Sequence, residues 1–256
     1  LLNGNQTNII FTEYIIRRKK ELNQLKGGEY TVKTIVTTEL IKDIAEKNHI
    51  ICYDVYTGFK WIADIIRKEG GEKFIGGGEE SFGYMPGAFT RDKDGVSATS
   101  LMAEIAAWVK MQNKTLYSFL KEIYAKYGFS QERMIYIVRK GLSGAQEKAM
   151  MEEFRHNTPK EINHSPVVLK KDYLSLEATN LQTGEKTHLD FETKSDVLQF
   201  FLADGSKISV RPSGTEPKIK FYFEARTQMK DINDYERAQQ EANARIDAII
   251  EYLKIQ

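Results

Sequence analysis

Helical and strand-like patterns alternate through the first half of this chain, and this alternation constrains its fold more than any other feature. Apolar residues recur at helical spacing in some segments, and runs of Thr, Val, Ile and aromatic residues are typical of strands in others. The run 50–55 is apolar almost throughout, as expected for a strand covered on both faces. This order predicts a doubly wound α/β domain. The predicted helices are 8–25, about 40–45, 60–68, 97–110 and 116–127, and the predicted strands are 30–36, 50–55 and 73–75.

The pattern changes after Tyr127-Gly128, where strand candidates become more frequent than helices. Asp204-Gly205 stands between two of these candidates and is a strong hairpin signal. A mixture of antiparallel strands and helices predicts an α+β domain, so we expect two domains, 1–128 and 129–256. The predicted strands are 134–138, 167–169, 197–202, 208–210 and 219–223, the predicted helices are 143–155 and 232–249, and 180–187 and 193–195 are predicted surface loops.

The composition shows no strong electrostatic preference. Among 256 residues, 37 Lys plus Arg stand against 36 Asp plus Glu, so no overall field draws the chain to nucleic acid or to an anionic membrane. The single cysteine, Cys52, lies in an apolar run, excludes an internal disulfide and fits a reducing cytoplasm. No apolar run approaches the roughly 18 residues that span a bilayer. These features predict a cytoplasmic protein with local anion affinity at most.

One turn in the second half carries the residue types that bind phosphate. The run Arg211-Pro212-Ser213-Gly214-Thr215-Glu216-Pro217-Lys218 stands between two strand-like segments. Arginine offers a planar fork to two phosphate oxygens, Ser213 and Thr215 add hydroxyl donors, and Gly214 lets backbone N–H groups converge on an anion. The run is equally compatible with an ordinary hairpin turn, because Pro, Ser and Gly are common turn residues.

A glycine-rich segment in the first half carries groups suited to a sugar. It reads Gly76-Gly77-Gly78-Glu79-Glu80-Ser81-Phe82-Gly83-Tyr84. The glycines allow a loop to pass close to a ligand, and in an extended segment Glu79 and Ser81 point the same way. A carboxylate beside a hydroxyl can bind neighbouring sugar hydroxyls. Together with the basic turn, this segment indicates a sugar phosphate as the ligand, bound at the carboxyl end of the sheet.

These motifs resemble those of the α-D-phosphohexomutase superfamily, the phosphoglucomutases and phosphomannomutases. In that family a G-E-x-S loop selects the sugar and an R-x-S-G-T loop holds its phosphate. Thr57-Gly58-Phe59-Lys60 resembles the family's T-G-x-K turn, and Arg91-Asp92-Lys93-Asp94-Gly95 resembles its glucomutase branch. The resemblance covers nearly the whole chain but only the third and fourth of the family's four domains. Because the opening Leu1-Leu2-Asn3-Gly4-Asn5-Gln6 lacks a methionine and resembles the start of the third domain, we expect a truncated or proteolytic piece.

The resemblance implies a fold and a set of contacts. The fold is a three-layer α/β/α, Rossmann-like sugar-binding domain followed by an α+β domain similar to the TATA-binding-protein fold. Lys93 is also a candidate for proton transfer, but its pKa would have to be lowered by nearby Lys60 or Arg91 for it to act as a base. The implied substrate contacts are Thr57, Gly58, Lys60, Glu79, Ser81, Arg91 and Lys93, and the implied phosphate contacts are Arg211, Ser213, Gly214, Thr215 and Lys218.

The resemblance also implies chemistry that these residues do not supply. Family members interconvert hexose 1-phosphate and hexose 6-phosphate through a phosphoserine, with hexose 1,6-bisphosphate as the activating intermediate and Mg²⁺ as the metal. The T-x-S-H-N-P type serine loop and the D-x-D-x-D-R type metal loop belong to the first two domains and do not occur here. Asp92-Lys93-Asp94 has a lysine between its carboxylates, so we predict no metal site in this chain. We expect the piece to be inactive without its missing N-terminal domains.

The substrate and the class of function stay open at this point. The loop Glu79-Glu80-Ser81 is closer to glucose-type and mixed glucose/mannose mutases, yet the phosphopentomutase branch shares the G-Y-M style of continuation. A stand-alone, non-catalytic sugar-phosphate-binding or regulatory module is the alternative from another class. Phe59 replaces a histidine that some family members carry, so no histidine contact is predicted there. No chemistry is assigned to His49, His156, His164 or His188.

Overall fold

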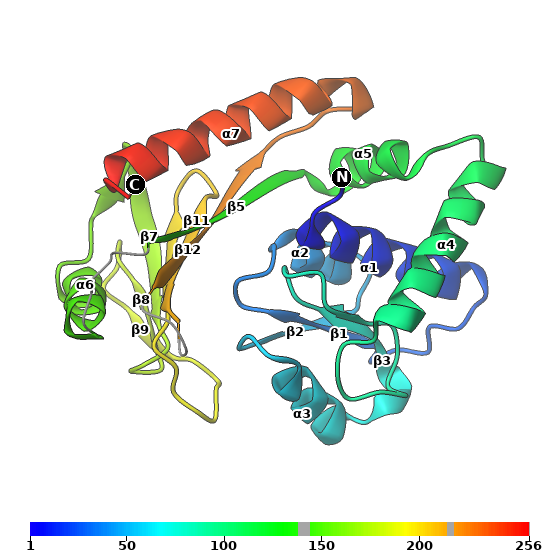
Figure 1. The fold of residues 1–256 in the computed structure, drawn as a ribbon, viewed down its shortest axis with the longest axis horizontal. Coiled ribbons are helices and arrows are strands. Elements are labelled where there is room, and N and C mark those ends of the chain that lie inside the picture. The colour runs from blue at the N-terminus through cyan, green and yellow to red at the C-terminus, as the bar shows by residue number, and fades with distance from the viewer. Residues whose placement is uncertain (138–143, 214–217, 256) are drawn as a thin grey trace. The chain divides into compact units, whose positions relative to one another are not determined.

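A four-stranded sheet and a larger antiparallel sheet form the centres of two units in the computed structural model, which describes residues 1–137, 144–213 and 218–255 (Figure 1). Unit 1 comprises Leu1–Phe129 with Met229–Tyr235, and unit 2 comprises Ser130–Gln228 with Glu236–Gln256. The short segment 229–235 thus belongs with unit 1, although the sequence analysis places it in the second domain.

Unit 1 is a three-layer α/β/α structure, as predicted. Its strand order is β2-β1-β3-β4, with β2, β1 and β3 parallel and β4 antiparallel to β3. Helix α3 packs on one face of the sheet, and α1 and α2 cover the other (Figure 1). The elements are α1 (Gly4–Glu21), β1 (Tyr30–Thr34), α2 (Leu40–Lys47), β2 (Ile51–Val55), α3 (Phe59–Glu69), η1 (Gly71–Lys73), β3 (Phe74–Gly78), β4 (Tyr84–Met85), α4 (Gly95–Met111) and α5 (Leu116–Tyr127).

Helix α1 begins at Gly4, earlier than the predicted start at residue 8. Asn3 and Gln6 form a capping box: the Gln6 N–H donates to Asn3 Oδ1 at 2.9 Å, and the Asn3 N–H donates to Gln6 Oε1 at 3.0 Å. The box satisfies two N–H groups that the helix start would leave unpaired. The helix ends at Glu21, before the Gly27-Gly28 pair that was expected to stop it.

Strands β1 and β2 differ in burial. All five residues of β1 are buried, whereas Ile51 in β2 is 46% exposed. Helices α2 and α3 contact β2 from opposite faces, as predicted for residues 50–55, but the burial is incomplete because β2 lies at the edge of the sheet and has a neighbouring strand on one side only. The apolar cluster of the sheet and α3 contains Tyr30, Val32, Val55, Phe59, Ile62, Ile66, Phe74 and Met85.

The glycine triplet belongs to a buried strand and not to the loop in which the sequence analysis placed it. Gly76, Gly77 and Gly78 are the last residues of β3. A Cβ on Gly77 would lie 2.6 Å from the backbone oxygen of Val32, and one on Gly78 would lie 2.4 Å from Asn8 Oδ1. Both distances are shorter than real contacts, so close packing of neighbours accounts for these glycines.

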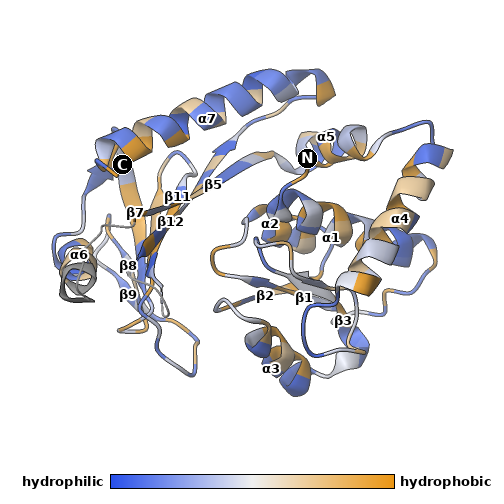
Figure 2. Ribbon diagram, in the orientation of Figure 1, coloured by the Kyte–Doolittle hydropathy of each residue, from blue (hydrophilic) through white to orange (hydrophobic). Residues whose placement is uncertain are grey.

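Unit 2 is an α+β structure built on an antiparallel sheet, as predicted. The strand order is β5-β12-β11-β10-β7-β8-β9, with β6 paired to β7. Helix α6 packs against β10 and β11, and the apolar stripe of α7, which includes Ala238, Ala242 and Ile246, is buried. The side of α7 drawn in Figure 2 is mostly hydrophilic. The elements are β5 (Phe129–Ile137), α6 (Gly144–His156), β6 (Glu161–Ile162), β7 (Ser165–Asp172), β8 (Glu177–Asn180), β9 (Lys186–His188), β10 (Leu198–Leu202), β11 (Lys207–Pro212), β12 (Ile219–Thr227), η2 (Ile232–Asp234) and α7 (Tyr235–Tyr252).

The predicted hairpin and one predicted loop had opposite outcomes. Asp204-Gly205 joins β10 and β11, with Gly205 at φ 84°, which confirms the hairpin. Residues 180–187 were expected to form a loop, but part of this segment belongs to the β8–β9 hairpin. All of β9 is exposed, so this strand lacks the apolar alternation that sequence analysis uses to recognise strands.

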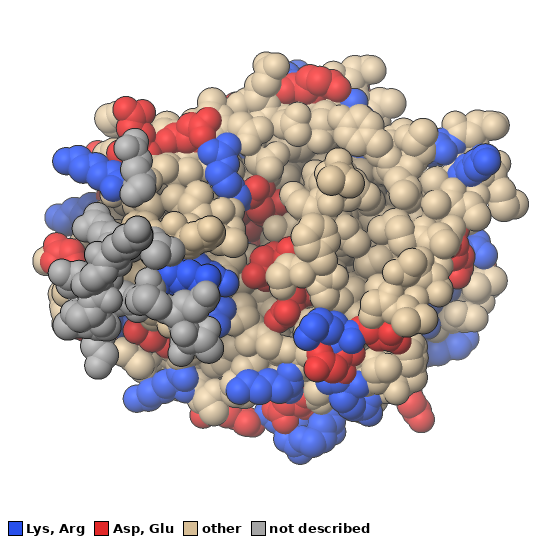
Figure 3. Space-filling model, viewed as in Figure 1, with Lys and Arg blue, Asp and Glu red and all other residues tan. Residues whose placement is uncertain are grey.

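The distribution of charged side chains agrees with the nearly equal numbers of acidic and basic residues. Acidic and basic side chains are interspersed on the face drawn in Figure 3. Among the described residues, no helix combines the length and apolar character needed to cross a membrane.

Candidate functional site

Several sequence segments meet at the carboxyl end of the sheet in unit 1. We call residues 57–60, 79–83 and 91–94 the loop cluster. The turn after β2 contacts the segment after β3, because the Gly58 N–H donates to Glu79 Oε1 at 2.6 Å. The third segment lies against the second, because a Cβ on Gly83 would lie 3.5 Å from Lys93 Cβ, and the Asp94 N–H donates at 3.0 Å to the oxygen of Tyr84, which directly follows the second segment. The structure therefore brings together the predicted substrate contacts of this unit.

Glu79 is held at several of its atoms. Its Oε1 accepts from the Gly58 N–H, and its Oε2 accepts from Ser81 Oγ at 3.4 Å. Its backbone oxygen accepts from Asn8 Nδ2 at 2.7 Å, and its N–H donates to the Gly83 oxygen at 2.9 Å. Gly58 is the N-cap of α3, so the carboxylate faces the positive end of a helix. A carboxylate offers about four acceptor positions, which leaves capacity for sugar hydroxyls.

Glu80 points to different partners from Glu79, although the two are adjacent. Glu80 Oε2 accepts from Thr34 Oγ1 at 3.3 Å and from Thr37 Oγ1 at 3.4 Å. Both threonines are fully buried and hydrogen-bond each other at 2.8 Å. Sequence reasoning did not select Glu80. Its contacts fasten the loop to the turn after β1, while Glu79 remains at the surface of the cluster.

A buried lysine lies at the same end of the sheet. The Lys33 side chain is fully buried, and its Nζ lies 2.6 Å from Asp54 Oδ1 and 3.1 Å from Glu39 Oε1. Burial acts to lower the pKa of Lys33, but the two carboxylates outweigh it and hold that pKa well above its ordinary value. Burial also raises the pKa of the Cys52 thiol to about 12, so the thiol stays protonated and unreactive at neutral pH.

The predicted cations of the loop cluster contact neighbouring residues of the same unit. Lys60 Nζ lies 4.8 Å from the centre of the Trp61 ring. Arg91 donates to the Thr90 oxygen at 3.0 Å and also to the Ala88 oxygen. Lys93 Nζ lies 3.4 Å from Asp92 Oδ1 and 5.6 Å from the centre of the Phe59 ring. All three cations are exposed, and such surface contacts are weak enough for the side chains to turn toward a ligand. Thr57 is half-buried in the turn before α3.

The acidic pair in this cluster serves the backbone. Asp94 Oδ1 accepts from the N–H groups of Val96 and Ser97 at 3.0 and 3.3 Å and caps α4. Hydrogen bonds from Ser97 and from the Val96 N–H lower the pKa of Asp94. Asp92 Oδ1 accepts from the Lys93 N–H at 2.7 Å. In the part of the chain that the structure describes, no group of three or more His, Cys, Asp and Glu side chains could hold a metal ion.

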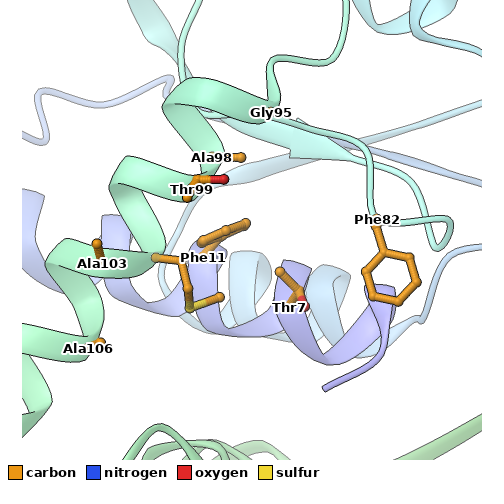
Figure 4. Close-up of a pocket in the computed structure, with 9 residues that line it drawn as sticks. Thr7, Phe11, Phe82, Gly95, Ala98, Thr99, Ala103 and Ala106 are labelled. Carbon is orange, nitrogen blue, oxygen red and sulfur yellow. The ribbon is translucent and has the colours of Figure 1, made fainter. Parts of the chain in front are cut away.

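An apolar groove borders the cluster. It has a volume of about 460 Å³ and lies between α1 and α4, with Phe82 at one end (Figure 4). Phe82 is 64% exposed and has φ 71°, which is unusual for a residue other than glycine. Phe11, Ala98 and Met102 are among the other residues of the lining. This lining contains no charged side chain and does not suit a phosphate.

The basic turn of unit 2 is the β11–β12 hairpin. Its loop is closed by a hydrogen bond of 2.8 Å from the Ser213 N–H to the Lys218 oxygen. Lys218 Nζ lies 5.2 Å from the centre of the Tyr136 ring of β5. Gly214 and Thr215 lie outside the described residues. The two interpretations of this run are therefore compatible, because a hairpin carries the predicted phosphate-binding residues.

The register of this hairpin adds a residue that sequence reasoning missed. Arg211 stands directly opposite Lys220, so both side chains are on the same face of the sheet. At the far end of the same ladder, Lys207 stands opposite Glu224, and Lys207 Nζ lies 3.2 Å from Glu224 Oε2. Opposed like charges destabilise a sheet. The Arg211–Lys220 pair therefore favours an anion beside it. Counting outward from the turn could have predicted this pair.

Two family descriptions match the sequence. Residues 3–127 match "Phosphoglucomutase/phosphomannomutase, alpha/beta/alpha domain III", and residues 158–248 match "Phosphoglucomutase/phosphomannomutase, C-terminal domain". The matched stretches contain the loop cluster and the basic hairpin respectively.

Curated relatives match over most of this chain. The phosphoglucomutase of Staphylococcus aureus strain MRSA252 is 33% identical over 246 residues, which cover 95% of this chain and 43% of that protein. The phosphoglucomutase of the bovine strain RF122 / ET3-1 is 35% identical over 222 residues, which cover 86% of this chain and 39% of that protein. The chain thus spans less than half the length of these relatives.

Solved structures share the fold. The open form of Paramecium pp63/parafusin, a phosphoglucomutase, has a TM-score of 0.65 at 19% identity, covering 98% of this chain and 41% of that one. A putative phosphomannomutase from Thermus thermophilus has a TM-score of 0.58 at 18% identity, covering 98% of this chain and 40% of that one. These likenesses support the predicted architecture of a Rossmann-like domain and a TATA-binding-protein-like domain.

Proposed function

Because this chain belongs to the phosphoglucomutase/phosphomannomutase family, we propose that it is the sugar-selecting and phosphate-holding part of a phosphohexomutase. The whole enzyme would be an intramolecular phosphotransferase that interconverts hexose 1-phosphate and hexose 6-phosphate, with glucose or mannose as the sugar. The observation that carries this proposal is the geometry of Glu79, whose carboxylate is fixed by the Gly58 N–H and lies beside the Ser81 hydroxyl.

In this proposal the loop cluster binds the sugar. The Glu79 carboxylate accepts hydrogen bonds from sugar hydroxyls, and the Ser81 hydroxyl donates to or accepts from a neighbouring one. Thr57 and Gly58 form the adjoining turn. The fixed carboxylate does not have to be ordered when the sugar binds, which lowers the entropic cost of binding. Lys60, Arg91 and Lys93 are exposed at the edge of the cluster and supply positive charge to the ligand. A proton-transfer role for Lys93 stays part of the proposal.

The basic hairpin binds the phosphate in this proposal. Arg211 donates two parallel hydrogen bonds, the hydroxyls of Ser213 and Thr215 and the backbone at Gly214 add neutral donors, and Lys218 adds charge. We add Lys220 to this set, because it stands opposite Arg211 with the same charge. The phosphate would relieve the repulsion between these two cations.

Chemistry in such an enzyme depends on positioning and charge stabilisation. A hexose phosphate that binds in either of two orientations presents its 1-oxygen or its 6-oxygen to the same phosphoryl donor. One sugar loop and one phosphate loop then serve both half-reactions, and hexose 1,6-bisphosphate is the intermediate that turns between the two orientations. The residues of this chain hold the sugar and the phosphate that is not transferred.

The donor serine and the magnesium ion would come from outside these residues. Asp92 and Asp94 do not fit a magnesium site, because the Lys93 ammonium lies beside Asp92 and Asp94 caps α4. Magnesium would supply charge neutralisation at the transferring phosphoryl group. We therefore propose that N-terminal domains of the same protein are the partner of this piece and that the piece alone does not turn over. We also propose that the whole enzyme is cytoplasmic, with which the single cysteine of these 256 residues is consistent.

Mutase turnover by the whole protein tests the proposal. The assay supplies Mg²⁺, the matching sugar bisphosphate and one of three substrates: glucose 1-phosphate, mannose 1-phosphate or ribose 1-phosphate. It measures formation of the hexose 6-phosphate from the first two and of ribose 5-phosphate from the third. Turnover of either hexose supports the proposal, and preference for ribose moves the protein to the phosphopentomutase branch. Binding of a hexose phosphate without turnover would instead support a non-catalytic sugar-phosphate-binding or regulatory module.

A further inference from the structure

Two buried asparagines in the first turns of α1 each contact a segment at the carboxyl end of the sheet in unit 1. Asn8 is 1% exposed and donates from Nδ2 to the Glu79 backbone oxygen at 2.7 Å. Asn5 is 8% exposed, and its Oδ1 accepts from the Thr38 N–H at 3.0 Å. Helix α1 is therefore tied by polar contacts to the segment after β3 and to the turn after β1.

The helix also lies against the Glu79 segment without room for extra atoms. A Cβ on Gly4 would lie 1.9 Å from the Glu80 backbone oxygen and 2.7 Å from the Phe82 nitrogen. Gly78, just before the segment, approaches the Asn8 amide in the same way. Because the Gly4 contacts are to backbone atoms of Glu80 and Phe82, a shift of the helix start toward them must move the segment that carries Glu79.

We propose that Asn8 and Gly4 are positioning residues that fix the backbone of residues 79–82 and thereby set the place of the Glu79 carboxylate. This inference uses the proposed sugar-binding role of Glu79 for its kinetic test only. Through Asn5, the same helix is tied to the turn whose Thr37 holds Glu80. One helix start thus contacts both the segment that carries the two glutamates and the turn that fastens Glu80.

The chemistry of residue 8 must be that of an amide in this arrangement. The Glu79 backbone oxygen accepts its hydrogen bond from the Asn8 side-chain amide. Asn8 lies one helical turn after Gly4, and its side chain reaches this oxygen while the residue stays buried. Alanine at position 8 leaves that oxygen unpaired, so the segment has to move toward water to satisfy it. Alanine at position 4 is a better helix former than the glycine it replaces, but its Cβ pushes on the Glu80 oxygen directly.

The Gly58 amide reports the position of Glu79, because its N–H is bonded to Glu79 Oε1. Residue-resolved hydrogen exchange on the 256-residue chain compares Asn8→Ala with Asn48→Ala. Asn48 is a matched control, because it is 8% exposed, lies in the same unit and contacts Ile44 and Tyr127 away from the cluster. We expect Gly58 to exchange about tenfold faster in Asn8→Ala than in Asn48→Ala, after normalisation to the Val32 amide in β1.

A second pair of variants keeps the test decisive if Asn8→Ala folds poorly. Gly4→Ala should accelerate Gly58 exchange, whereas Gly95→Ala should not. Gly95 also begins a helix of unit 1, but a Cβ there meets nothing within 4 Å. Equal Gly58 exchange in the members of each pair would overturn the inference, whatever the activity of the protein.

Kinetics of the whole protein test the consequence for the sugar. We expect Asn8→Ala to lower kcat/KM for glucose 1-phosphate by roughly 10–100-fold, since small misplacements of positioned groups cost this much. When Asn8→Ala is combined with Glu79→Gln in a double-mutant cycle, the two losses in kcat/KM should be strongly non-additive. When Asn48→Ala is combined with Glu79→Gln, the effects on kcat/KM should be additive. Additive losses for Asn8→Ala would contradict positioning through Glu79. Absence of mutase turnover in the wild type would refute the proposed function and leave the exchange result to decide the positioning role.

Discussion

The Gly58 N–H donates a hydrogen bond of 2.6 Å to Glu79 Oε1 and so joins the turn after β2 to the segment after β3. The two residues belong to different sequence motifs. Gly58 is at φ 119°, a conformation that residues with a side chain rarely adopt, and this conformation aims its N–H at the carboxylate. The contact explains why a glycine stands at the start of α3.

Gly58→Ala should weaken sugar binding through this contact. Gly70 provides a matched control, because it flanks the other end of α3 at φ 84° and an added Cβ there meets nothing within 4 Å. Each alanine should cost about 1–3 kcal/mol of folding free energy through backbone strain. We expect only Gly58→Ala to raise KM for glucose 1-phosphate, by roughly tenfold. Equal KM values in the two variants would show that the contact does not position Glu79 for the ligand.

Lys220→Ala should weaken phosphate binding by the basic hairpin. Removing one of two cations that share an anion typically costs about 1–3 kcal/mol, or roughly 5–150-fold in affinity. NMR titration of inorganic phosphate into the chain measures this, with Lys186→Ala as the control because Lys186 is exposed in β9 of the same unit. Wild-type affinity in Lys220→Ala would remove Lys220 from the site.

Alkaline pH should destabilise unit 1. The Cys52 pKa is about 12 in the folded chain against an ordinary value of 9.0, so above pH 9 the unfolded chain releases a proton that the folded chain keeps. The free energy of unfolding then falls as pH rises, by up to about 1.4 kcal/mol per pH unit from this thiol. Lys33, whose pKa is also raised, adds to the fall above about pH 10.5.

Urea denaturation between pH 8 and pH 10 measures this slope. Cys52→Ser retains a small polar side chain that does not titrate in this range, so its slope should be flatter than that of the wild type. Identical slopes in the two proteins would show that the thiol does not carry the effect.

Gly77→Ala should destabilise the sheet. Its Cβ would lie 2.6 Å from the Val32 oxygen, and overpacking of this kind costs about 1–3 kcal/mol. Gly95→Ala, with open space around the Cβ, should change stability by much less. Thermal unfolding of the two variants measures the difference. Equal melting temperatures would contradict the packing explanation for Gly77 and would favour the sequence-based prediction that the glycines let a loop pass close to a ligand.

The sequence predicted those elements whose ends are marked by local signals such as turn residues. The helix over 116–127 was predicted with both of its ends, and in the structure Thr115 caps it and Gly128 follows it. The Asp204-Gly205 hairpin was predicted from its turn residues. The start of α1 was missed because its signal, the Asn3–Gln6 capping box, precedes the apolar pattern by several residues.

Contacts between distant segments could not be predicted from local patterns. Asn8 and Glu79 are 71 residues apart, and nothing near Asn8 in the sequence indicates a buried amide that serves a loop. The sequence singled out Glu79 through its spacing from Ser81 but gave no role to Glu80, whose contacts with Thr34 and Thr37 appear only in the fold. The motifs therefore predicted candidate ligand-binding residues, whereas the residues that hold these candidates in place could be found only from the fold.

We propose that the loop cluster and the basic hairpin bind different parts of one sugar phosphate. Calorimetric titration of the whole protein with glucose 1-phosphate and with inorganic phosphate, for the wild type, Glu79→Ala and Arg211→Ala, tests it directly. Glu79→Ala should weaken glucose 1-phosphate binding by roughly 10–100-fold and leave phosphate binding unchanged, and Arg211→Ala should weaken both. Unchanged affinity for glucose 1-phosphate in Glu79→Ala, or unchanged affinity for both ligands in Arg211→Ala, would contradict the claim.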